Sequence, residues 1–314
     1  MLKASVIITT YQRSGFLIRA LHSVLNQEYD NFEIIIVDDN GRNSDFQRSN
    51  EKLLQEYISD NRIKYVALEN NSGACNARNQ GALNAQGEYL FFLDDDDEFL
   101  PKKLAVQVDF LDKNSLYAAH LSSMIRINYN GAQIISIENM PRGSDFVSFA
   151  MDGNFFTPMM AIRKNIFLEL GGFDEIDRFQ DQYFMNKLLA EGYRVKMDSI
   201  PLHIMYEHNE KRITDISLAK SLESLDKLLN FKCIYKEKFT PAKWKEVEVK
   251  HLKMKAFVFS LSEKYIHHLK ASLLYMELFV KQPSKKILYM VFRSFIPVYM
   301  GDFSGINKQL KKPL

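Results

Sequence analysis

The first hundred residues of this 314-residue chain alternate regularly between short apolar runs and helical patterns, and this alternation constrains the fold more than any other feature. The apolar runs are rich in β-branched and aromatic residues, which is typical of buried parallel strands. They cover residues 5–10, 32–39, 63–68 and 88–94, and helical patterns cover residues 14–25, 45–58 and 73–85. Strands and helices at this spacing predict an α/β fold built on a doubly wound sheet.

The segments that follow are expected to extend this sheet. Residues 115–137 predict an antiparallel pair of strands that turns at Asn130-Gly131. Residues 157–162 and 201–208 predict two more strands, and a helix is expected to follow Asp181. Ser14 is the expected N-cap of the first helix.

The balance of charge divides the chain near residue 215. Residues 1–219 hold 22 Lys and Arg against 31 Asp and Glu, a net charge of −9, whereas residues 220–314 hold 19 against 8, a net charge of +11. The second part has a lysine-rich helical pattern, and its Thr240-Pro241 pair favours a helix start. We therefore expect an α/β domain at residues 1–214 and a basic helical C-terminal region at residues 215–314.

Cysteine content and hydropathy bear on the location of the protein. The two cysteines, Cys75 and Cys233, lie far apart in sequence and suggest neither a disulfide framework nor a zinc site. The apolar part of the N-terminal stretch MLKASVIITTYQR is too short for a signal peptide. No run approaches the ~18 apolar residues of a membrane-spanning helix. We therefore expect a cytoplasmic protein.

Four consecutive aspartates, Asp94 to Asp97, follow the strand expected at residues 88–94. Ligands of doubly wound sheets bind beyond the carboxyl ends of the strands, which is where these side chains fall. A solvated acidic turn is the simpler interpretation, but crowded carboxylates repel one another and a bound cation would offset that cost. Hard cations such as Mg²⁺ and Mn²⁺ prefer carboxylate oxygens and often bridge to substrate phosphates, so we expect a divalent cation site.

Two other segments are expected at the same edge of the sheet. Residues 69–87 form a helical pattern with one face of small residues, and the stretch Asn70-Asn71-Ser72-Gly73 before it offers free N–H groups that suit a phosphate. Arg78 lies one turn into this helix. Asp39 ends the second strand, where a carboxylate can accept a hydrogen bond from a nucleobase. Ordinary helix capping and a loop-initiating Asp-Asn pair remain the alternatives for these two segments.

Taken in order, SVIITTYQR, IIIVDDN, NSGACNARNQGAL and GEYLFFLDDDDEF closely resemble the inverting, GT-A-fold glycosyltransferases of family 2, of the bacterial surface-polysaccharide type. The resemblance covers about residues 3–210. It implies a hexosyltransferase that moves a sugar from a nucleotide diphosphate sugar to a hydroxyl. The donor that the resemblance implies is a UDP-sugar. The resemblance also implies a nucleotide pocket lined by Thr9, Tyr11, Asp39, Arg78, Asp94 and Asp95, and a Mn²⁺ or Mg²⁺ ion bound by Asp96.

Two further positions follow from the resemblance. The segment GGFDE and the residues after it match the family segment that carries the catalytic base, with Gln180 in place of the usual Glu and Asp181 as the base. His208 matches a family histidine that reaches the diphosphate or the metal. A carboxylate in the first turn of a helix also has a purely structural interpretation, because it favours the helix dipole.

A single base opposite the leaving group implies one displacement with inversion at the anomeric carbon. The alternative function is a catalytically inactive binding or scaffold protein that has kept the fold. A dehydrogenase is excluded because no Gly-x-Gly-x-x-Gly follows the first strand.

The C-terminal region has two interpretations. Its apolar positions, among them Leu273, Leu274, Met276, Leu278 and Phe279, fit the core of a helical bundle. Residues 284–300 instead interleave basic and aromatic side chains, as a helix at a membrane surface does. The resemblance implies a glycan or lipid-linked acceptor. Together with the basic charge of this region, it leads us to expect attachment to an anionic membrane surface, on the inner face of the cell membrane. No nucleic-acid motif is present, so nucleic acid is not an expected partner.

Overall fold

The computed structural model describes residues 2–207, 217–262 and 265–294. The chain divides into two compact units. The first, here called the sheet unit, comprises Met1–Glu175 and Gln180–Lys211; the second, the helical unit, comprises Ile176–Phe179 and Arg212–Leu314. The two units are described separately.

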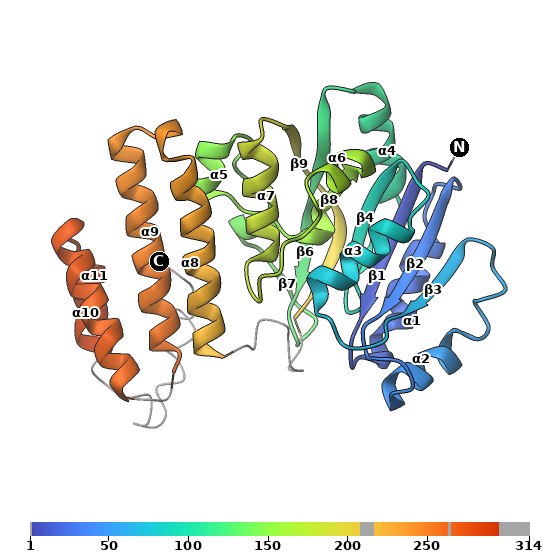
Figure 1. Ribbon diagram of the computed structural model, residues 1–314, viewed down its shortest axis with the longest axis horizontal. Helices are drawn as coiled ribbons and strands as arrows, with labels where there is room; N and C mark the ends of the chain where they lie inside the picture. The colour runs from blue at the N-terminus through green and yellow to red at the C-terminus, as the bar shows by residue number, and fades with distance from the viewer. Residues whose placement is uncertain (1, 208–216, 263–264, 295–314) are drawn as a thin grey trace. The chain divides into compact units, whose positions relative to one another are not determined.

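The sheet unit is an α/β structure around one mixed sheet, as the sequence predicts (Figure 1). Within the described residues the strand order is β3-β2-β1-β4-β8-β6-β9-β5, and β7 pairs with β6. The strands are β1 (Ala4–Thr10), β2 (Phe32–Asp38), β3 (Ile63–Ala67), β4 (Tyr89–Asp94), β5 (Glu98–Phe99), β6 (Tyr117–Ile127), β7 (Gln133–Ile134), β8 (Met160–Arg163) and β9 (Arg194–Tyr206). The first four strands along the chain are mutually parallel, and β8 joins β4 antiparallel.

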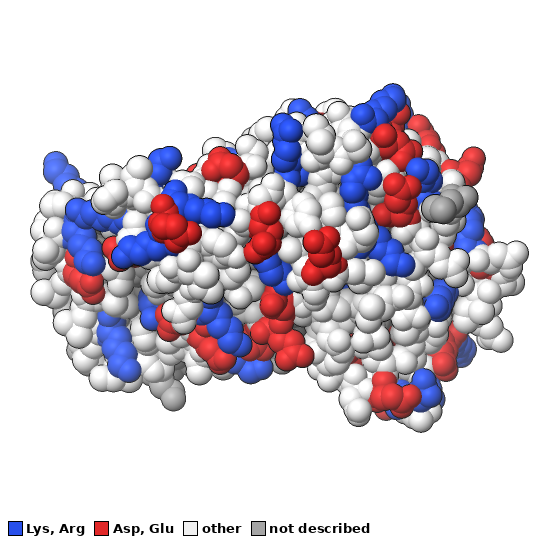
Figure 2. Space-filling model, turned by 45° about the horizontal axis from the view of Figure 1, so that its top comes forward, with Lys and Arg blue, Asp and Glu red and all other residues white. Residues whose placement is uncertain are grey.

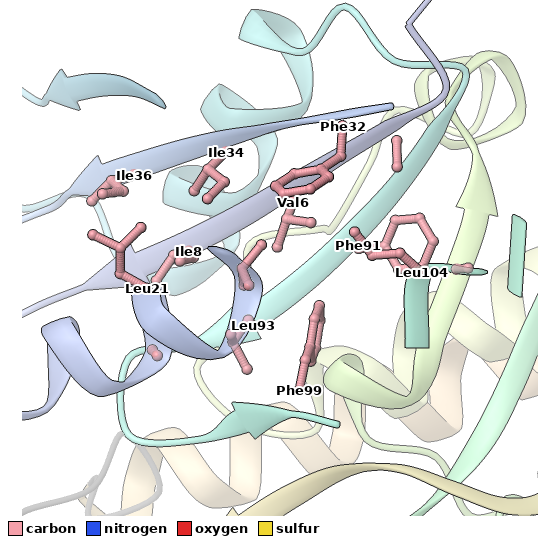
Figure 3. Close-up of a cluster of buried hydrophobic side chains, with 14 of the residues drawn as sticks. Val6, Ile8, Leu21, Phe32, Ile34, Ile36, Phe91, Leu93, Phe99 and Leu104 are labelled. Atoms are coloured by element: carbon pink, nitrogen blue, oxygen red, sulfur yellow. The ribbon is translucent and has the colours of Figure 1, made fainter. Parts of the chain in front are cut away.

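Helices cover both faces of this sheet, and the alternation along the strands explains how. The even positions Val6 and Ile8 of β1 join a buried cluster with residues of β2, β4 and the helices α1 and α4, which Figure 3 shows. The odd position Ile7 faces the other way, toward α3. The helices are α1 (Ser14–Leu25), α2 (Asp45–Leu54), α3 (Ala74–Asn84), α4 (Lys103–Lys113), α5 (Phe146–Asp152), α6 (Lys164–Glu169) and α7 (Gln180–Ala190).

The small-residue face of α3 allows this helix to lie close to β1. A Cβ atom built on Gly81 would lie 2.4 Å from Cγ2 of Ile7, a side chain that is fully buried. Close packing of α3 fixes the position of its N-terminus, which opens at the carboxyl edge of the sheet beside β1 and β2.

The structure corrects four of the expected boundaries. The strand expected at residues 201–208 is β9, which already begins at Arg194. Arg13, not Ser14, is the N-cap of α1, and Ser14 is the first helical residue. Helix α2 ends at Leu54 and continues as turns, in which the N–H of Ile58 still bonds the carbonyl of Leu54. The segment expected as a strand at 157–162 starts as a 3₁₀ turn, Thr157–Met159, because Pro158 has a fixed φ and no N–H to give to the sheet.

The helical unit consists of α8 (Leu218–Ile234), α9 (Pro241–Ser260), α10 (Tyr265–Lys281) and α11 (Lys285–Ser294) among the described residues. The predicted start at Thr240-Pro241 is confirmed: the Thr240 hydroxyl accepts a hydrogen bond from the N–H of Lys243, and Pro241 opens the helix. Helices α9, α10 and α11 share a buried cluster that includes Ala256, Tyr275 and Ile287. Among the described residues, no helix combines the length and the apolar character needed to span a membrane.

We predict that Gly81→Val lowers the free energy of unfolding by about 1–3 kcal/mol, because its methyl groups would overlap Ile7. Urea unfolding followed by circular dichroism measures the change. Leu83→Ala is the matched control: Leu83 lies on the same helix with 61% of its surface exposed, and its truncation should change stability by less than about 0.5 kcal/mol. Equal stability of the two variants would contradict the close packing of α3 on β1.

Candidate active site at the carboxyl edge of the sheet

The carboxyl ends of β1, β2 and β4 lie side by side, because the three strands are parallel and in register. Thr10 pairs with Asp38 of β2, and Thr9 pairs with Asp94 of β4. Two acidic clusters that are more than fifty residues apart in sequence are thus brought to one edge of the sheet. Thr9, assigned to the nucleotide pocket by resemblance, lies between them.

The aspartate run forms a tight turn between β4 and β5. The N–H of Asp97 bonds the carbonyl of Asp94 at 3.1 Å, and the Asp97 carboxylate accepts a hydrogen bond from the N–H of Tyr206 at 3.1 Å. Asp95 and Asp97 are buried, whereas Asp94 and Asp96 are partly exposed. Burial raises the pKa of Asp95 to about 7, and burial with the charge of Asp96 raises the pKa of Asp97 well above its usual value. The turn therefore holds carboxyl groups at a cost that positive charge nearby must offset.

Two arginines of the segment that follows β1 supply this charge. A guanidinium nitrogen of Arg13 bonds the carboxylate of Asp96, and the same nitrogen lies 3.8 Å from a carboxylate oxygen of Asp95. Arg19 bonds the backbone carbonyl of Asp96, and its guanidinium stacks over the Tyr206 ring at 4.1 Å. Both arginines reach the aspartates because only three residues separate the end of β1 from the start of α1.

The residues of this turn fit a divalent cation by the chemistry of their oxygens. Their side chains offer several carboxylate oxygens in a small volume, and Oδ2 of buried Asp95 has no hydrogen-bond partner. Within the described residues, no three His, Cys, Asp or Glu side chains are already arranged as a metal site. A cation bound by Asp96 would share the Asp96 carboxylate with Arg13 or take the place of Arg13 there. His208, the other predicted ligand, lies outside the described residues.

A second cation, Arg78 of α3, joins the aspartate turn to the start of α7. Its side chain is buried; one nitrogen bonds the Asp94 carboxylate at 2.6 Å, and another bonds the side-chain carbonyl of Gln180 at 2.9 Å. The next residue, Asp181, bonds the N–H of Gln182 through its carboxylate at 2.7 Å. Three residues that are far apart in sequence, Asp94, Arg78 and Asp181, thus form one constellation.

The environment of Asp181 suits a general base. Burial raises the pKa of its carboxyl to about 6, and the charge of Asp94 adds to this effect. The positive charge of Arg78 and the hydrogen bond from Gln182 oppose it. A carboxylate with this pKa is largely ionised at neutral pH and binds a proton more readily than an exposed carboxylate does.

Asp39 lies in front of the N-terminus of α3 and caps it. One carboxylate oxygen accepts hydrogen bonds from the N–H and the hydroxyl of Ser72, at 2.7 and 2.9 Å. The other oxygen accepts from the N–H of Gly73 at 2.8 Å and from the side-chain amide of Asn71 at 2.9 Å. Two of the N–H groups that the sequence analysis expected to bind a phosphate, those of Ser72 and Gly73, are thus bonded to Asp39 in this structure.

Neighbouring Asp38 is a framework residue. Its buried carboxylate accepts hydrogen bonds from the side chains of Asn50 and Tyr65, at 2.7 and 2.8 Å, and from the side chain of Asn40 at 2.8 Å. Asn40 in turn accepts a bond from the N–H of Gln12, whose φ of 56° marks the turn after β1. Tyr11, assigned to the nucleotide pocket, is 42% exposed on this turn.

An open pocket of about 530 Å³ lies beside the starts of α1 and α2. It is lined by residues 12–16 at the start of α1 and by Asp45, Phe46 and Ser49 of α2. Arg13 therefore lines this pocket and also bonds the Asp96 carboxylate.

The structure gives four residues roles in the candidate site that the sequence analysis did not predict. Arg13 and Arg19 balance the aspartates, and Asn71 and Ser72 hold the carboxylate of Asp39. The role of Arg13 could have been predicted, because it lies three residues after the end of the first strand and four carboxylates at one edge require counter-charge. No sequence pattern indicated the role of Arg19, because its distance from the aspartate turn depends on the path of α1.

Solved structures show the class of fold. The chain is similar to Staphylococcus aureus TarS 1–349 in complex with UDP-GlcNAc, with a TM-score of 0.67 and 17% identity over 93% of this chain and 89% of that one. It is also similar to the mannosyltransferase PcManGT from Pyrobaculum calidifontis in complex with GDP-Man and Mn²⁺, with a TM-score of 0.55 and 18% identity over 93% and 84% of the two chains. At such identities the likeness concerns the fold alone, which is the GT-A fold.

Sequence comparison shows the family. Residues 5–171 match the model of glycosyl transferase family 2, more than half of the chain, and the protein belongs to this family. A Campylobacter jejuni relative, GalNAc(5)-diNAcBac-PP-undecaprenol beta-1,3-glucosyltransferase, is 30% identical over 71% of this chain and 75% of its own length. An uncharacterized glycosyltransferase of Rickettsia bellii is 37% identical over 44% of this chain, and the match spans only 19% of that relative.

We predict that Asp39→Ala lowers the free energy of unfolding by about 1–3 kcal/mol, because the N–H groups of Ser72 and Gly73 lose their acceptor. Urea unfolding without any nucleotide measures this change. Glu69→Ala, which removes a nearby carboxylate that is 69% exposed, is the control and should change stability by less than about 0.5 kcal/mol. An unchanged stability of Asp39→Ala would show that Asp39 does not cap α3.

Proposed function

We propose that the protein transfers a sugar from a nucleotide diphosphate sugar to a hydroxyl of a glycan acceptor, with inversion at the anomeric carbon, in surface-polysaccharide or related glycan synthesis. The observation that carries the proposal is the placement of Asp181. Its carboxyl, with a pKa raised to about 6 by burial, lies at the start of α7, and its neighbour Gln180 is tied through Arg78 to the aspartate turn. Membership of glycosyl transferase family 2 supports the reaction class.

In this mechanism Asp181 accepts the proton of the acceptor hydroxyl as the oxygen attacks the anomeric carbon. Attack occurs on the face opposite the leaving nucleoside diphosphate, so a single displacement inverts the configuration. Arg78 orients the start of α7 through Gln180 and keeps a positive charge between Asp94 and Asp181. No second catalytic carboxylate is required.

The donor pocket is proposed to comprise Thr9, Tyr11, Asp39, Arg78, Asp94 and Asp95. Asp39 would contact the base, and Asp94 or Asp95 the ribose. Hydrogen bonds from the side chains of Asn71 and Ser72 hold the Asp39 carboxylate in place. A nucleobase N–H would replace one of these two side-chain donors. The UDP-GlcNAc named with the structure of TarS supports a uridine donor, whereas the GDP-Man named with PcManGT shows that the fold accepts other bases.

We assign the divalent cation, Mn²⁺ or Mg²⁺, to Asp96, with His208 as a further ligand. When bound, the cation would offset the negative charge that develops on the departing diphosphate. Burial raises the pKa values of Asp95 and Asp97. The added positive charge of the cation would favour the ionised form of both carboxyl groups. The Mn²⁺ named with PcManGT supports this choice of ion.

The acceptor is proposed to be lipid-linked, and the protein to act at the inner face of the cell membrane without crossing it. The undecaprenol-linked substrate in the name of the Campylobacter jejuni relative supports a lipid-linked acceptor. The net charge of +11 in residues 220–314 suits an anionic membrane surface.

Release of nucleoside diphosphate from a panel of UDP- and GDP-sugars, with and without Mn²⁺, tests the proposed function. We expect one donor to be consumed in a metal-dependent manner, and the product to have the anomeric configuration opposite to the donor's by NMR coupling constants. Binding of a nucleotide sugar without any turnover would instead favour a catalytically inactive protein.

Asp181→Asn is predicted to lower kcat by about 10²–10⁴-fold, because the amide cannot accept the proton. Nucleotide affinity, measured by calorimetry, should change by no more than a few-fold. In the wild type, Asp181 is protonated below its pKa, so kcat should rise with pH, reach about half of its plateau near pH 6 and level off at higher pH. The residual activity of Asp181→Asn should lack this rise.

Asp174→Asn is the matched control for this variant. Asp174 is an exposed carboxylate of the same segment, paired with Lys187, and its change should leave kcat near the wild-type value. A wild-type rate in Asp181→Asn would exclude Asp181 as the base.

Asp96→Ala is predicted to abolish Mn²⁺ binding and sugar transfer together, and chelation should have the same effect on the wild type. Titration with Mn²⁺, followed by the electron paramagnetic resonance of the free ion, measures binding independently of activity. Asp45→Asn changes a highly exposed carboxylate that lines the neighbouring pocket and should bind Mn²⁺ as the wild type does. Full activity in excess chelator would exclude a required cation.

A further inference from the structure

Helix α10 of the helical unit has two apolar faces, of which only one is buried. Ala271, Tyr275 and Leu278 face the core shared with α9 and α11. The other face exposes Ile266, Leu273, Met276 and Val280, with exposed fractions between 49% and 81%. These positions are spaced by 7, 3 and 4 residues, so they form one stripe that is about 21 Å long at 1.5 Å per residue.

The next helix continues this pattern. On α11, Ile287 and Val291 are buried against α10, and the hydroxyl of Ser272 bonds the carbonyl of Val291 at 2.8 Å. Leu288, Tyr289 and Phe292 of α11 are exposed instead, Phe292 by 64%. We call the seven exposed apolar side chains of α10 and α11 the α10–α11 face. The sequence pattern alone would place Leu273 and Met276 in a bundle core, whereas the structure leaves them on the surface.

The charges that flank this face have one dominant sign. Described side chains of α10 and α11 include Lys270, Lys281, Lys285 and Lys286 against a single acid, Glu277, which is paired with Lys281 at 3.3 Å. Lys253 of α9 adds a further cation beside α11, because its ammonium group bonds the side chain of Gln282 and interacts electrostatically with Lys286. Figure 2 shows Lys and Arg side chains spread over the surface of the helical unit in the face drawn.

This combination selects among possible occupants. A second copy of the same face would bring two groups of lysines together, and like charges in contact oppose association. An anionic lipid surface satisfies both features, because its acyl region takes apolar side chains and its headgroups attract lysines. The long lysine side chains can reach headgroups while their stems lie along the apolar surface.

We propose that the α10–α11 face is the surface by which the protein rests on an anionic lipid bilayer, with Leu273, Met276, Val280 and Phe292 in the interface and the four lysines at headgroup level. This inference deepens the proposed action on a lipid-linked acceptor and rests on that proposed function. The sequence pattern placed the membrane contact at residues 284–300, and this proposal adds α10 to that contact.

Co-sedimentation of the full chain with vesicles tests the proposal. The vesicles are phosphatidylcholine alone, or phosphatidylcholine with 30% phosphatidylglycerol. We expect binding to the anionic vesicles, weaker binding at high salt, and little binding to the neutral ones. Leu273→Ser with Val280→Ser should weaken binding tenfold or more, and Lys285→Gln with Lys286→Gln should weaken it by about 25-fold, roughly fivefold for each charge.

Ile135→Ser is the matched control, because Ile135 is an apolar side chain of the sheet unit with 92% exposure, and its change should leave vesicle binding as in the wild type. Wild-type vesicle binding by the α10 double variant, equal binding to neutral vesicles, or no binding by the wild type would each overturn the proposal. Loss of self-association in the α10 double variant, without any vesicle binding, would assign the face to a second copy instead.

Nucleoside diphosphate release, measured without vesicles, separates this inference from the proposed function. The α10 and α11 variants should release the nucleotide at the wild-type rate, because none of the changed residues belongs to the catalytic site. Absence of release from every protein, with vesicle binding as expected, would overturn the transferase proposal and leave the membrane surface standing.

Discussion

The candidate site depends on the crowding of carboxylates at one edge of the sheet and on the three arginines that make this crowding tolerable. Parallel pairing in register places Asp38, Asp39 and the aspartate turn next to one another, whatever their mutual repulsion. Arg13, Arg19 and Arg78 each reach the turn from a different position on α1 or α3. The electrostatic balance of the candidate site therefore depends on how the helices pack, because each helix places one or two positive charges beside the aspartate turn.

Helix α3 connects the parts of this arrangement. Its small-residue face brings it against β1, its N-terminus is capped by Asp39, and Arg78 in its second turn bonds both Asp94 and Gln180. A helix with larger side chains would stand further from the sheet, and neither the cap nor the arginine would reach its partner. The same few small residues thus determine both the packing of the sheet unit and the geometry of its acidic edge.

Much of this could be predicted from the sequence, because it depends on local patterns. Strand and helix alternation predicted the fold class, and apolar runs that end in aspartates predicted that these aspartates meet at one edge of the sheet. The partners of the charged residues could not be predicted: Arg13 pairs with Asp96 across 83 positions, and Arg78 reaches Gln180 across 102. Such contacts depend on helix orientation, which periodicity does not specify. For the same reason the sequence did not show which apolar face of α10 is buried.

The tetrapeptide Ile176–Phe179 is a part of the helical unit that interrupts the sheet unit in sequence. It belongs to that unit, where Asp177 pairs with Lys220 at 2.8 Å and the N–H of Arg178 bonds the hydroxyl of Ser224 at 3.2 Å, although the residues on both sides belong to the sheet unit. The polypeptide therefore crosses between the units three times. Because α7, with Asp181, starts immediately after this tetrapeptide, the helical unit is no interchangeable module. Any recombination or truncation that replaces it must also supply new partners for the four residues that lead into the proposed base.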